Sequence, residues 1–299
     1  MAPNLLQSVP SRPARTAIVV FFIIFLIANL QWLSRYTGQQ RTPLAGEASV
    51  NQTTSRQNQN QIDWSRFAYA QYATNADYLC NSVMLFQGLD RLGSKADRML
   101  MYPSRFSAES KSVEGNLLRK ALEYDVNLVP IQVQKRDRDY TWGESYTKLL
   151  AFNQTQYDRV LVLDSDSTIT KPMDELFLLP PSPVAMPRAY WMDPHDFVMT
   201  SALMLIEPSE FEFKRIEQSI SEALPHHFDM EIVNDLYNNS ALILPHRPYI
   251  LLTGEFRNTD HIRYMGNSLE SWDPEKILWQ AKFVHFSDWP VPKPWISAD

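Results

Sequence analysis

One stretch of the sequence reads Asp158-Arg159-Val160-Leu161-Val162-Leu163-Asp164-Ser165-Asp166. Its apolar run is typical of a strand that is buried on both faces of a parallel sheet. Side chains alternate along a strand, so Asp164 and Asp166 point to the same face at its end. Two carboxylates there can share a divalent cation, which can bridge them to a diphosphate. The stretch therefore predicts a buried strand with a metal site at its carboxyl end.

The sequence around this strand predicts an α/β domain. From residue 63 onward, short β-rich runs alternate with amphipathic stretches, which is the pattern of a mostly parallel sheet flanked by helices. The predicted strands span residues 67–73, 98–101, 128–133, 159–163, 198–206 and 282–286. The predicted helices span residues 77–92, 112–124, 145–152, 209–223 and 229–237. Ligands of such sheets bind beyond the carboxyl ends of the strands, where we expect the chemistry.

Composition excludes several classes of protein. The chain has 299 residues, 44% of them hydrophobic, which is enough to bury a full core. The formal net charge of -6 is spread over interspersed acidic and basic residues, so no basic surface for nucleic acid is expected. A single cysteine, Cys80, excludes an intramolecular disulfide framework and a cysteine zinc cluster.

The N-terminal part predicts a membrane anchor. Residues 17–33 are mostly apolar, Arg12 and Arg15 precede them, and Trp32 stands at the interfacial position. The alternative is a cleaved signal peptide, but the residues after the apolar run lack the small-x-small cleavage pattern. We therefore expect a cytosolic tail at 1–16, a signal anchor at 17–33, a flexible stem at 34–62 and a lumenal domain at 63–299. Three glycosylation sequons, at Asn51, Asn153 and Asn238, favour the lumenal orientation.

A second cluster of chemically capable residues lies near the C-terminus. A short predicted strand delivers His285, and Lys293-Pro294-Trp295 follows. An imidazole added to two carboxylates suits Mn²⁺ better than Mg²⁺, and a lysine can neutralise phosphate charge. We interpret the tryptophans that stand outside this cluster as packing residues, namely Trp142, Trp191, Trp272 and Trp279.

A set of short motifs occurs in a fixed order over residues 67–295. Along the chain they are Ala73-Thr74-Asn75-Ala76-Asp77-Tyr78, Thr147-Lys148-Leu149, Leu163-Asp164-Ser165-Asp166, Ser201, Asp229, His285 and Lys293-Pro294-Trp295. The ordered set resembles glycosyltransferase family 8, the glycogenin-like retaining transferases. Within that family it is most similar to the fungal Golgi α-N-acetylglucosaminyltransferases. The order makes the set more specific than any single motif.

The resemblance implies a reaction and a metal site. The fold would be a single nucleotide-diphospho-sugar transferase domain of the GT-A type. The reaction would transfer a sugar, N-acetylglucosamine, from a UDP-sugar donor to a hydroxyl of a glycan acceptor with retention of anomeric configuration. Asp164, Asp166 and His285 would ligate Mn²⁺ or another divalent cation. The protein would be a single-pass type II protein of the Golgi membrane.

The resemblance also implies a nucleotide site. Thr74, Asn75 and Tyr78 would line the uridine pocket, with Tyr78 stacked on the base. The two lysines Lys148 and Lys293 would face the donor sugar and the diphosphate. The carboxylate of Asp229 would contact the sugar near its reacting carbon.

The sequence departs from the glycogenin pattern at three places. Asp229-Met230-Glu231 stands where Asp-Gln-Gly is usual, and Thr200 replaces an asparagine. The spacing from His285 to Lys293 is longer than usual and lacks the family's glycine. Two alternatives stay open: a transferase of the same fold that uses UDP-glucose or UDP-galactose, and a membrane-tethered sugar-nucleotide-binding protein without turnover.

Overall fold

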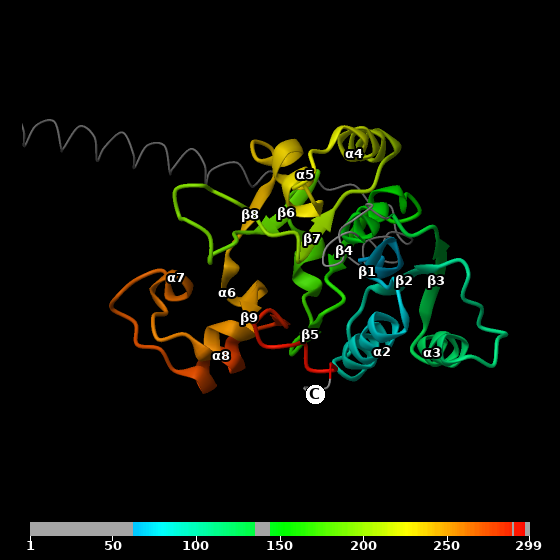
Figure 1. Ribbon diagram of the computed structural model, residues 1–299, viewed down its shortest axis with the longest axis horizontal. Coiled ribbons are helices and arrows are strands. Elements are labelled where there is room, and N and C mark those ends of the chain that lie inside the picture. Colours follow the sequence, from blue (N-terminus) through cyan, green and yellow to red (C-terminus); the bar gives the residue numbers. More distant parts are fainter. Residues whose placement is uncertain (1–61, 135–143, 289, 297–299) are drawn as a thin grey trace, which may run out of the picture. The chain divides into compact units, whose positions relative to one another are not determined.

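A mixed seven-stranded sheet organises the described residues (Figure 1). The computed structural model describes residues 62–134, 144–288 and 290–296, all within the compact unit Ile62–Asp299. The strands run in the order β3-β2-β1-β4-β7-β6-β8. Their bounds are β1 Phe67–Tyr72, β2 Asp97–Pro103, β3 Val126–Ile131, β4 Arg159–Leu163, β6 Val184–Pro187, β7 Leu203–Ile206 and β8 Leu242–Leu244. The first four strands of that order are parallel, β7 is antiparallel to both of its neighbours, and β6 is parallel to β8.

Alternation along the strands divides the core into two layers. In β4, Leu161 and Leu163 join one buried apolar cluster, whereas Val160 and Val162 join the other. All five residues of this strand are buried, as expected of a central strand covered on both faces. The continuous apolar run in the sequence therefore reflects a sheet that presents no face to water at this strand.

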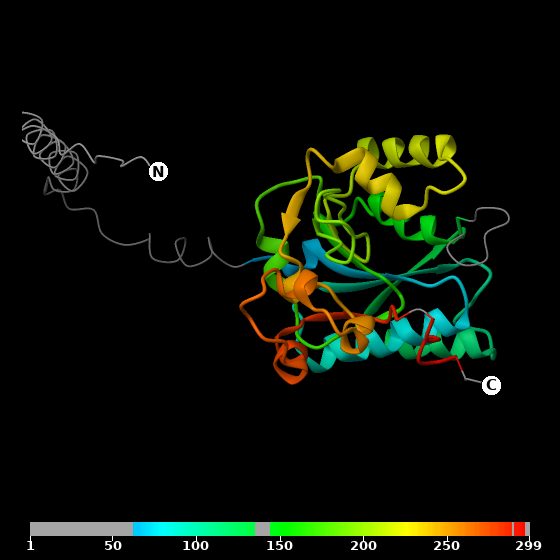
Figure 2. The ribbon, with the colours of Figure 1, turned by 60° about the vertical axis from the view of Figure 1, so that its left-hand side comes forward.

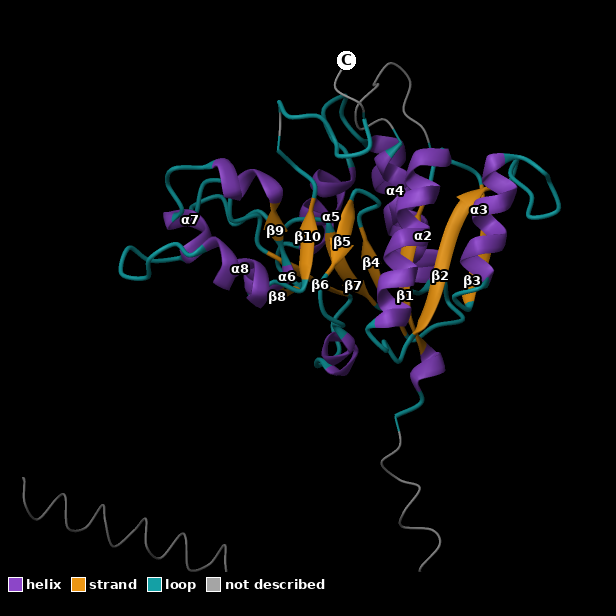
Figure 3. Cartoon of the chain, turned by 90° about the horizontal axis from the view of Figure 1, so that it is seen from below, coloured by secondary structure: helices purple, strands orange, loops and turns teal. Residues whose placement is uncertain are grey.

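Helices cover both faces of the sheet (Figures 2 and 3). One face carries α2 (Ala76–Arg91) and α3 (Val113–Leu122), which pack against each other. The other carries the 3₁₀ helix η2 (Ser145–Asn153) with α4 (Glu210–Glu222) and α5 (Asp229–Tyr237). Three of these helices begin at a side chain that accepts a backbone N–H, as N-cap residues do; the caps of α2, α3 and α4 are Asn75, Ser112 and Ser209.

A small second sheet stands beside the C-terminal end of β4. Its strands run in the order β5-β10-β9, with bounds β5 Ser167–Ile169, β9 Leu251–Leu252 and β10 Phe283–His285. Strand β10 is antiparallel to β5 and parallel to β9. Short helical segments accompany this sheet: η3 Asp174–Leu178, α6 His246–Tyr249, η4 Thr253–Arg257, α7 Ile262–Met265 and α8 Pro274–Gln280. A further 3₁₀ turn, η1 Trp64–Arg66, precedes β1.

The structure confirms the sequence prediction for the parallel half of the fold and corrects it elsewhere. Strand β4 has the predicted bounds, but the predicted strand at 198–206 is confined to β7, because residues 198–202 turn back toward β6 through the bridge of Arg188 with Met199. The predicted helix at 145–152 is a 3₁₀ helix. The large sheet is mostly parallel, as expected, and β7 is the strand that runs antiparallel to its neighbours.

The predicted N-terminal segments belong to the part of the chain that the structure does not describe. The tail at 1–16, the anchor at 17–33 and the stem up to residue 61 lie outside the described residues. Among the residues that the structure does describe, no helix is both long and apolar enough to cross a bilayer.

Candidate active site

The candidate site lies where the strand order of the large sheet reverses direction along the chain. Strand β1 pairs with β2 on one side and with β4 on the other, so the carboxyl ends of β1 and β4 meet there. Such a switch point is the usual ligand crevice of an open α/β sheet. Gln71, fully buried in β1, donates from Nε2 to the carbonyl oxygen of Leu163 over 2.9 Å and accepts from Ser82 Oγ over 3.1 Å. This amide fixes the end of β4 from which both aspartates project.

Asp164, Asp166 and His285 are brought together by the small sheet. In the β5–β10 pairing, His285 stands opposite Ser167, the residue that follows Asp166. The backbone N–H of Phe286 donates to the carbonyl oxygen of Asp166 over 2.8 Å. His285 Nε2 consequently lies 3.0 Å from Asp166 Oδ1 and 3.6 Å from Asp164 Oδ2. One candidate ligand atom from each of the three residues lies within 4.8 Å of the others.

The donor set of this cluster fits a divalent cation. Two carboxylates and an imidazole nitrogen are ligands that Mn²⁺ accepts. Among the described residues of the site, the carboxylates of Asp164, Asp166 and Asp229 contact the ammonium groups of Lys148 and Lys293. With a neutral imidazole the group has an excess of one negative charge, which a cation would offset.

Lys148 lies in a buried network on the inner side of the site. Its side chain is 3% exposed, and its ammonium group forms ion pairs with Asp164 Oδ1 and, over 2.7 Å, with Asp229 Oδ2. Ser201 Oγ donates to the same oxygen of Asp229 over 2.5 Å. Burial alone would lower the pKa of Lys148, but the two carboxylates raise it above its usual value. Burial opposes ionisation of Asp229 as well, yet Lys148 and Ser201 hold its pKa below the usual value.

The outer side of the site is more open. Lys293 Nζ lies 2.6 Å from Asp166 Oδ2, with 30% of the lysine side chain exposed, and it also donates to the carbonyl oxygen of Phe286. Despite burial, His285 and Lys293 hold the pKa of Asp166 far below its usual value. For Asp164 the effect of burial prevails, and its pKa is raised above the usual value in spite of Lys148.

An aromatic group borders the site at the start of α2. Tyr78 lies edge-on to Trp295, with ring centroids 6.1 Å apart, and Trp295 lies edge-on to Phe286 at 5.9 Å. Burial, followed by the charges of Asp166 and Asp164, raises the pKa of the Tyr78 hydroxyl to about 12. The ring is therefore a neutral, partly exposed surface near the carboxylates.

The other two residues predicted to bind uridine have structural contacts. Asn75 caps α2, and its Oδ1 accepts from the backbone N–H of Tyr78 over 3.1 Å. Thr74 is buried, and its carbonyl oxygen accepts from the guanidinium of Arg105 over 3.0 Å. The side-chain amide nitrogen of Asn75 and the hydroxyl of Thr74 remain the groups that could meet a base.

Sequence reasoning missed two residues that hold the site. Gln71 fixes the end of β4, and the hydroxyl of Tyr72 donates to Asp164 Oδ1 over 3.2 Å. Both stand in β1 directly before the quoted motif that begins at Ala73. A glutamine inside an apolar strand is the signal that could have identified the first, because a fully buried amide needs partners.

Comparison with known proteins places the chain in a family. A protein of Aspergillus fumigatus named glucose N-acetyltransferase 1 is 46% identical over 298 residues, covering 94% of this chain and 74% of the relative. The chain belongs to the glucose N-acetyltransferase 1 family. A member from Gibberella zeae is 60% identical over 245 residues, and one from Saccharomyces cerevisiae is 26% identical over 363. No profile of a known protein family matches the chain.

Coverage differs among these members of the glucose N-acetyltransferase 1 family. The match spans 54% of the Gibberella zeae protein's length, against 73% of the Saccharomyces cerevisiae protein's length. By its name the family consists of transferases, and this chain is a member of an enzyme family.

The fold is shared with solved glycosyltransferases. The bifunctional glycosyltransferase WbbM superposes with a TM-score of 0.57 at 14% identity, covering 78% of this chain and 47% of WbbM. LgtC superposes with a TM-score of 0.55 at 13% identity, covering 77% of this chain and 89% of LgtC. These likenesses establish a GT-A-like glycosyltransferase fold for this member of the family.

Proposed function

We propose that the protein is a retaining glycosyltransferase that transfers N-acetylglucosamine from a UDP-sugar to a hydroxyl group of a glycan. The observation that carries the proposal is the convergence of Asp164, Asp166 and His285 at the switch point of a glycosyltransferase fold. Such a set of oxygen and nitrogen ligands serves to bind a divalent cation beside a diphosphate. Family membership supports the same reaction class.

The metal-binding residues would be Asp164, Asp166 and His285, and the ion would be Mn²⁺ or a similar cation. When bound, the ion supplies positive charge that stabilises the departing diphosphate. Lys293 would support that role from the open side, because its ammonium group already lies against Asp166.

The buried network would hold the reacting sugar in place. Asp229 Oδ2 accepts from Ser201 and pairs with Lys148, so this carboxylate has a fixed orientation. We propose that Asp229 contacts the donor sugar near its reacting carbon and that Lys148 positions it. On the other side, the ring of Tyr78 would stack on uracil, with Thr74 and Asn75 beside it.

We further propose that the protein is a type II protein of the Golgi membrane with a lumenal domain. The apolar residues 17–33 and the flanking Arg12 and Arg15 support an anchor. Two sequon asparagines, Asn153 and Asn238, are exposed in the structure, as acceptors of glycans must be. Protease protection of the domain in sealed microsomes tests this topology, and digestion without detergent would refute it.

A UDP-release assay on the full chain in detergent tests the reaction. UDP-N-acetylglucosamine, UDP-glucose and UDP-galactose are supplied separately, with a glycan mixture as acceptor and Mn²⁺ present. We expect the fastest release with UDP-N-acetylglucosamine, and an α-configured product by NMR. Faster release from UDP-glucose or UDP-galactose would identify that sugar nucleotide as the donor instead. Binding of donors without release of UDP would favour the alternative of a binding protein without turnover.

A further inference from the structure

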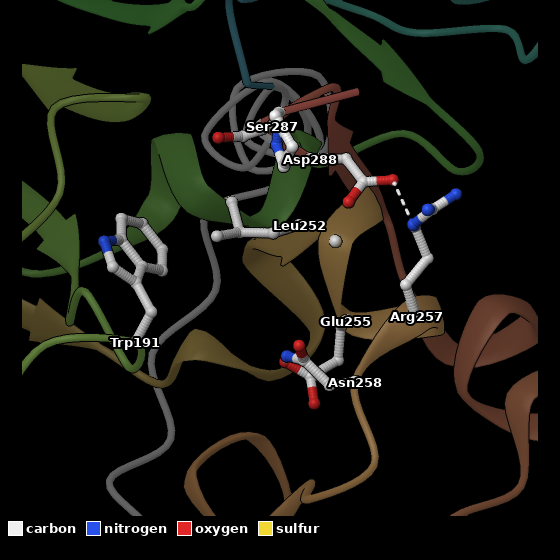
Figure 4. Close-up of a pocket in the computed structure, with 9 residues that line it drawn as sticks. Trp191, Leu252, Glu255, Arg257, Asn258, Ser287 and Asp288 are labelled. Carbon is white, nitrogen blue, oxygen red and sulfur yellow. Dashed lines mark hydrogen bonds and ion pairs between the residues drawn. The ribbon is translucent and has the colours of Figure 1, made fainter. Parts of the chain in front are cut away.

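A second candidate site lies beyond the metal-binding residues, on the β9 side of the small sheet. A half-open pocket of about 310 Å³ is formed there, within the size range of small-molecule sites (Figure 4). Residues from three separate segments line it, including Trp191, Leu252, Glu255, Asn258 and Ser287. Neither the predicted metal site nor the predicted uridine site includes any of these residues.

The pocket adjoins the metal-binding residues through β10. Leu252 pairs with His285 in the β9–β10 register, and Ser287 follows His285 by two residues. Strand β5 lies on the other side of β10, and it packs against α2. The order across this edge is therefore α2, β5, β10 and β9. A nucleotide held at α2 with its diphosphate near β5 and β10 leaves the β9 side for the group that receives the sugar.

Glu255 is the buried one among the charged residues that line this pocket. It is 5% exposed, and its Oε1 lies 2.7 Å from His261 Nδ1. The side-chain amide of Asn258 donates to its Oε2 over 3.4 Å. Among the described lining residues, the other carboxylate belongs to Asp288, which is paired at 3.4 Å with Arg257 at the rim. Glu255 is thus a buried, oriented acceptor with capacity for further hydrogen bonds, since a carboxylate accepts about four.

An aromatic wall stands opposite. Trp191 lines the pocket, and its position is fixed because Arg263 donates to its carbonyl oxygen over 2.6 Å. Behind it, Tyr190 lies edge-on to Trp191 at 5.2 Å and to Tyr264 at 5.0 Å. His261, which holds Glu255, is itself stacked on Trp272 at 3.9 Å. The sequence prediction that Trp272 packs is consistent with this cluster, whereas Trp191 also faces a pocket.

We propose that this pocket binds one pyranose unit of the acceptor glycan, with Glu255 accepting its hydroxyl groups and Trp191 packing against its apolar face. The inference rests on the proposed function. A carboxylate and a carboxamide match the hydroxyl donors and acceptors of a sugar, and an aromatic ring matches its C–H face. The same carboxylate would repel a diphosphate, which distinguishes this pocket from the donor site.

Two substitutions and two matched controls test the pocket. Glu255→Gln removes the charge at constant shape, and Trp191→Ala removes the wall. Glu270→Gln alters an ion-paired carboxylate outside the pocket, and Trp279→Ala removes a tryptophan that is 72% exposed on α8. Thermal denaturation of all four variants establishes which of them remain folded. If Glu255→Gln unfolds, Trp191→Ala still tests the proposal.

Binding is measured without turnover, by saturation-transfer difference NMR with the methyl pyranosides of mannose, galactose and glucose. We expect the wild-type chain to bind at least one of them, the pocket variants to bind it about 10- to 100-fold more weakly, and the controls to bind it normally. In transfer assays the acceptor KM should rise by a similar factor while the donor KM stays constant. Equal binding by wild-type and pocket variants, or no binding by the wild-type chain, would overturn the proposal.

The two proposals fail in different ways. If the wild-type chain released no UDP from any donor but bound a pyranoside through Glu255 and Trp191, the proposed reaction would be wrong and the sugar site would stand. If UDP release and transfer proceeded with an acceptor KM that neither substitution changes, the reaction would stand and the acceptor would bind elsewhere.

Discussion

Asp164 and Asp166 lie two positions apart, yet they face differently built surroundings. Asp164 belongs to a closed network with Lys148 and Tyr72, and that lysine is 3% exposed. Asp166 faces His285 and Lys293, and this lysine is 30% exposed. The inner network is fixed by the large sheet, whereas the outer contacts depend on the small sheet and the C-terminal segment. Charge on the inner side therefore maintains the site, and charge on the outer side is available to a ligand.

The largest expected effect is a difference in the free energy of unfolding between variants at the two lysines. Lys148→Met leaves Asp164 and Asp229 buried without their counter-charge, and loss of one partner of a buried pair costs about 3–5 kcal/mol. Lys293→Met removes a partly exposed ion pair, for which the cost is about 0–1 kcal/mol. Urea denaturation of both variants measures the free energies of unfolding. Equal losses would mean that the two sides of the site do not differ as described.

The second expected effect is on the kinetic constants of a variant at Lys293, the lysine on the outer side of the site. Negative charge on the diphosphate grows as the glycosidic bond breaks, so Lys293→Met should lower kcat about 100-fold with little change in donor KM. The matched control is Lys276→Met, which alters a half-exposed lysine paired with Glu270 away from the site. Steady-state kinetics over a range of donor concentrations gives both constants. A rise in donor KM alone would assign Lys293 to ground-state binding.

A smaller effect is expected at the aromatic border. Stacking of a base on an aromatic side chain contributes about 1–3 kcal/mol, and it acts in the ground state and transition state alike. Tyr78→Ala should therefore raise the donor KM by about tenfold and leave kcat nearly constant. Tyr78→Phe keeps the ring and should behave as the wild-type protein does. A variant Tyr78→Ala with unchanged donor KM would place the base elsewhere.

The smallest effect concerns Asn75, which the structure shows as a helix cap. Asn75→Ser preserves capping, whereas Asn75→Ala should cost about 1 kcal/mol of stability. If the side-chain amide also meets uracil, both variants should raise the donor KM. If Asn75 only caps α2, Asn75→Ser should match the wild-type protein in stability and in KM.

The parallel half of the fold could be predicted because its signals are local. The apolar run of β4 and the alternation of strands and helices before it predicted the bounds of β4 and the approximate positions of the neighbouring elements. In the small sheet the sequence predicted β10, as the strand at 282–286, but it did not predict β5 and β9. Those two strands have three and two residues, and they pair with β10 only across long separations in the sequence.

The same contrast applies to the sites. The motifs predicted the residues that gather at the end of β4, where His285 arrives from β10 of the small sheet. Sequence reasoning did not predict that Lys148 would be enclosed between two carboxylates, which depends on where η2 packs. Glu255 belongs to η4 and Trp191 to a loop, and the two segments meet only in the folded chain, so no spacing in the sequence relates them.

The central claim is that Asp164, Asp166 and His285 bind a divalent cation that sugar transfer requires. The most direct test is UDP release by the full chain as a function of Mn²⁺ concentration after treatment with chelator, compared between the wild-type protein and Asp166→Asn. We expect the wild-type chain to be inactive in chelator and to recover saturably with Mn²⁺, and the variant to stay at least about a thousandfold slower at every concentration. Turnover that persists in chelator, or a variant with the wild-type dependence on Mn²⁺, would contradict the account.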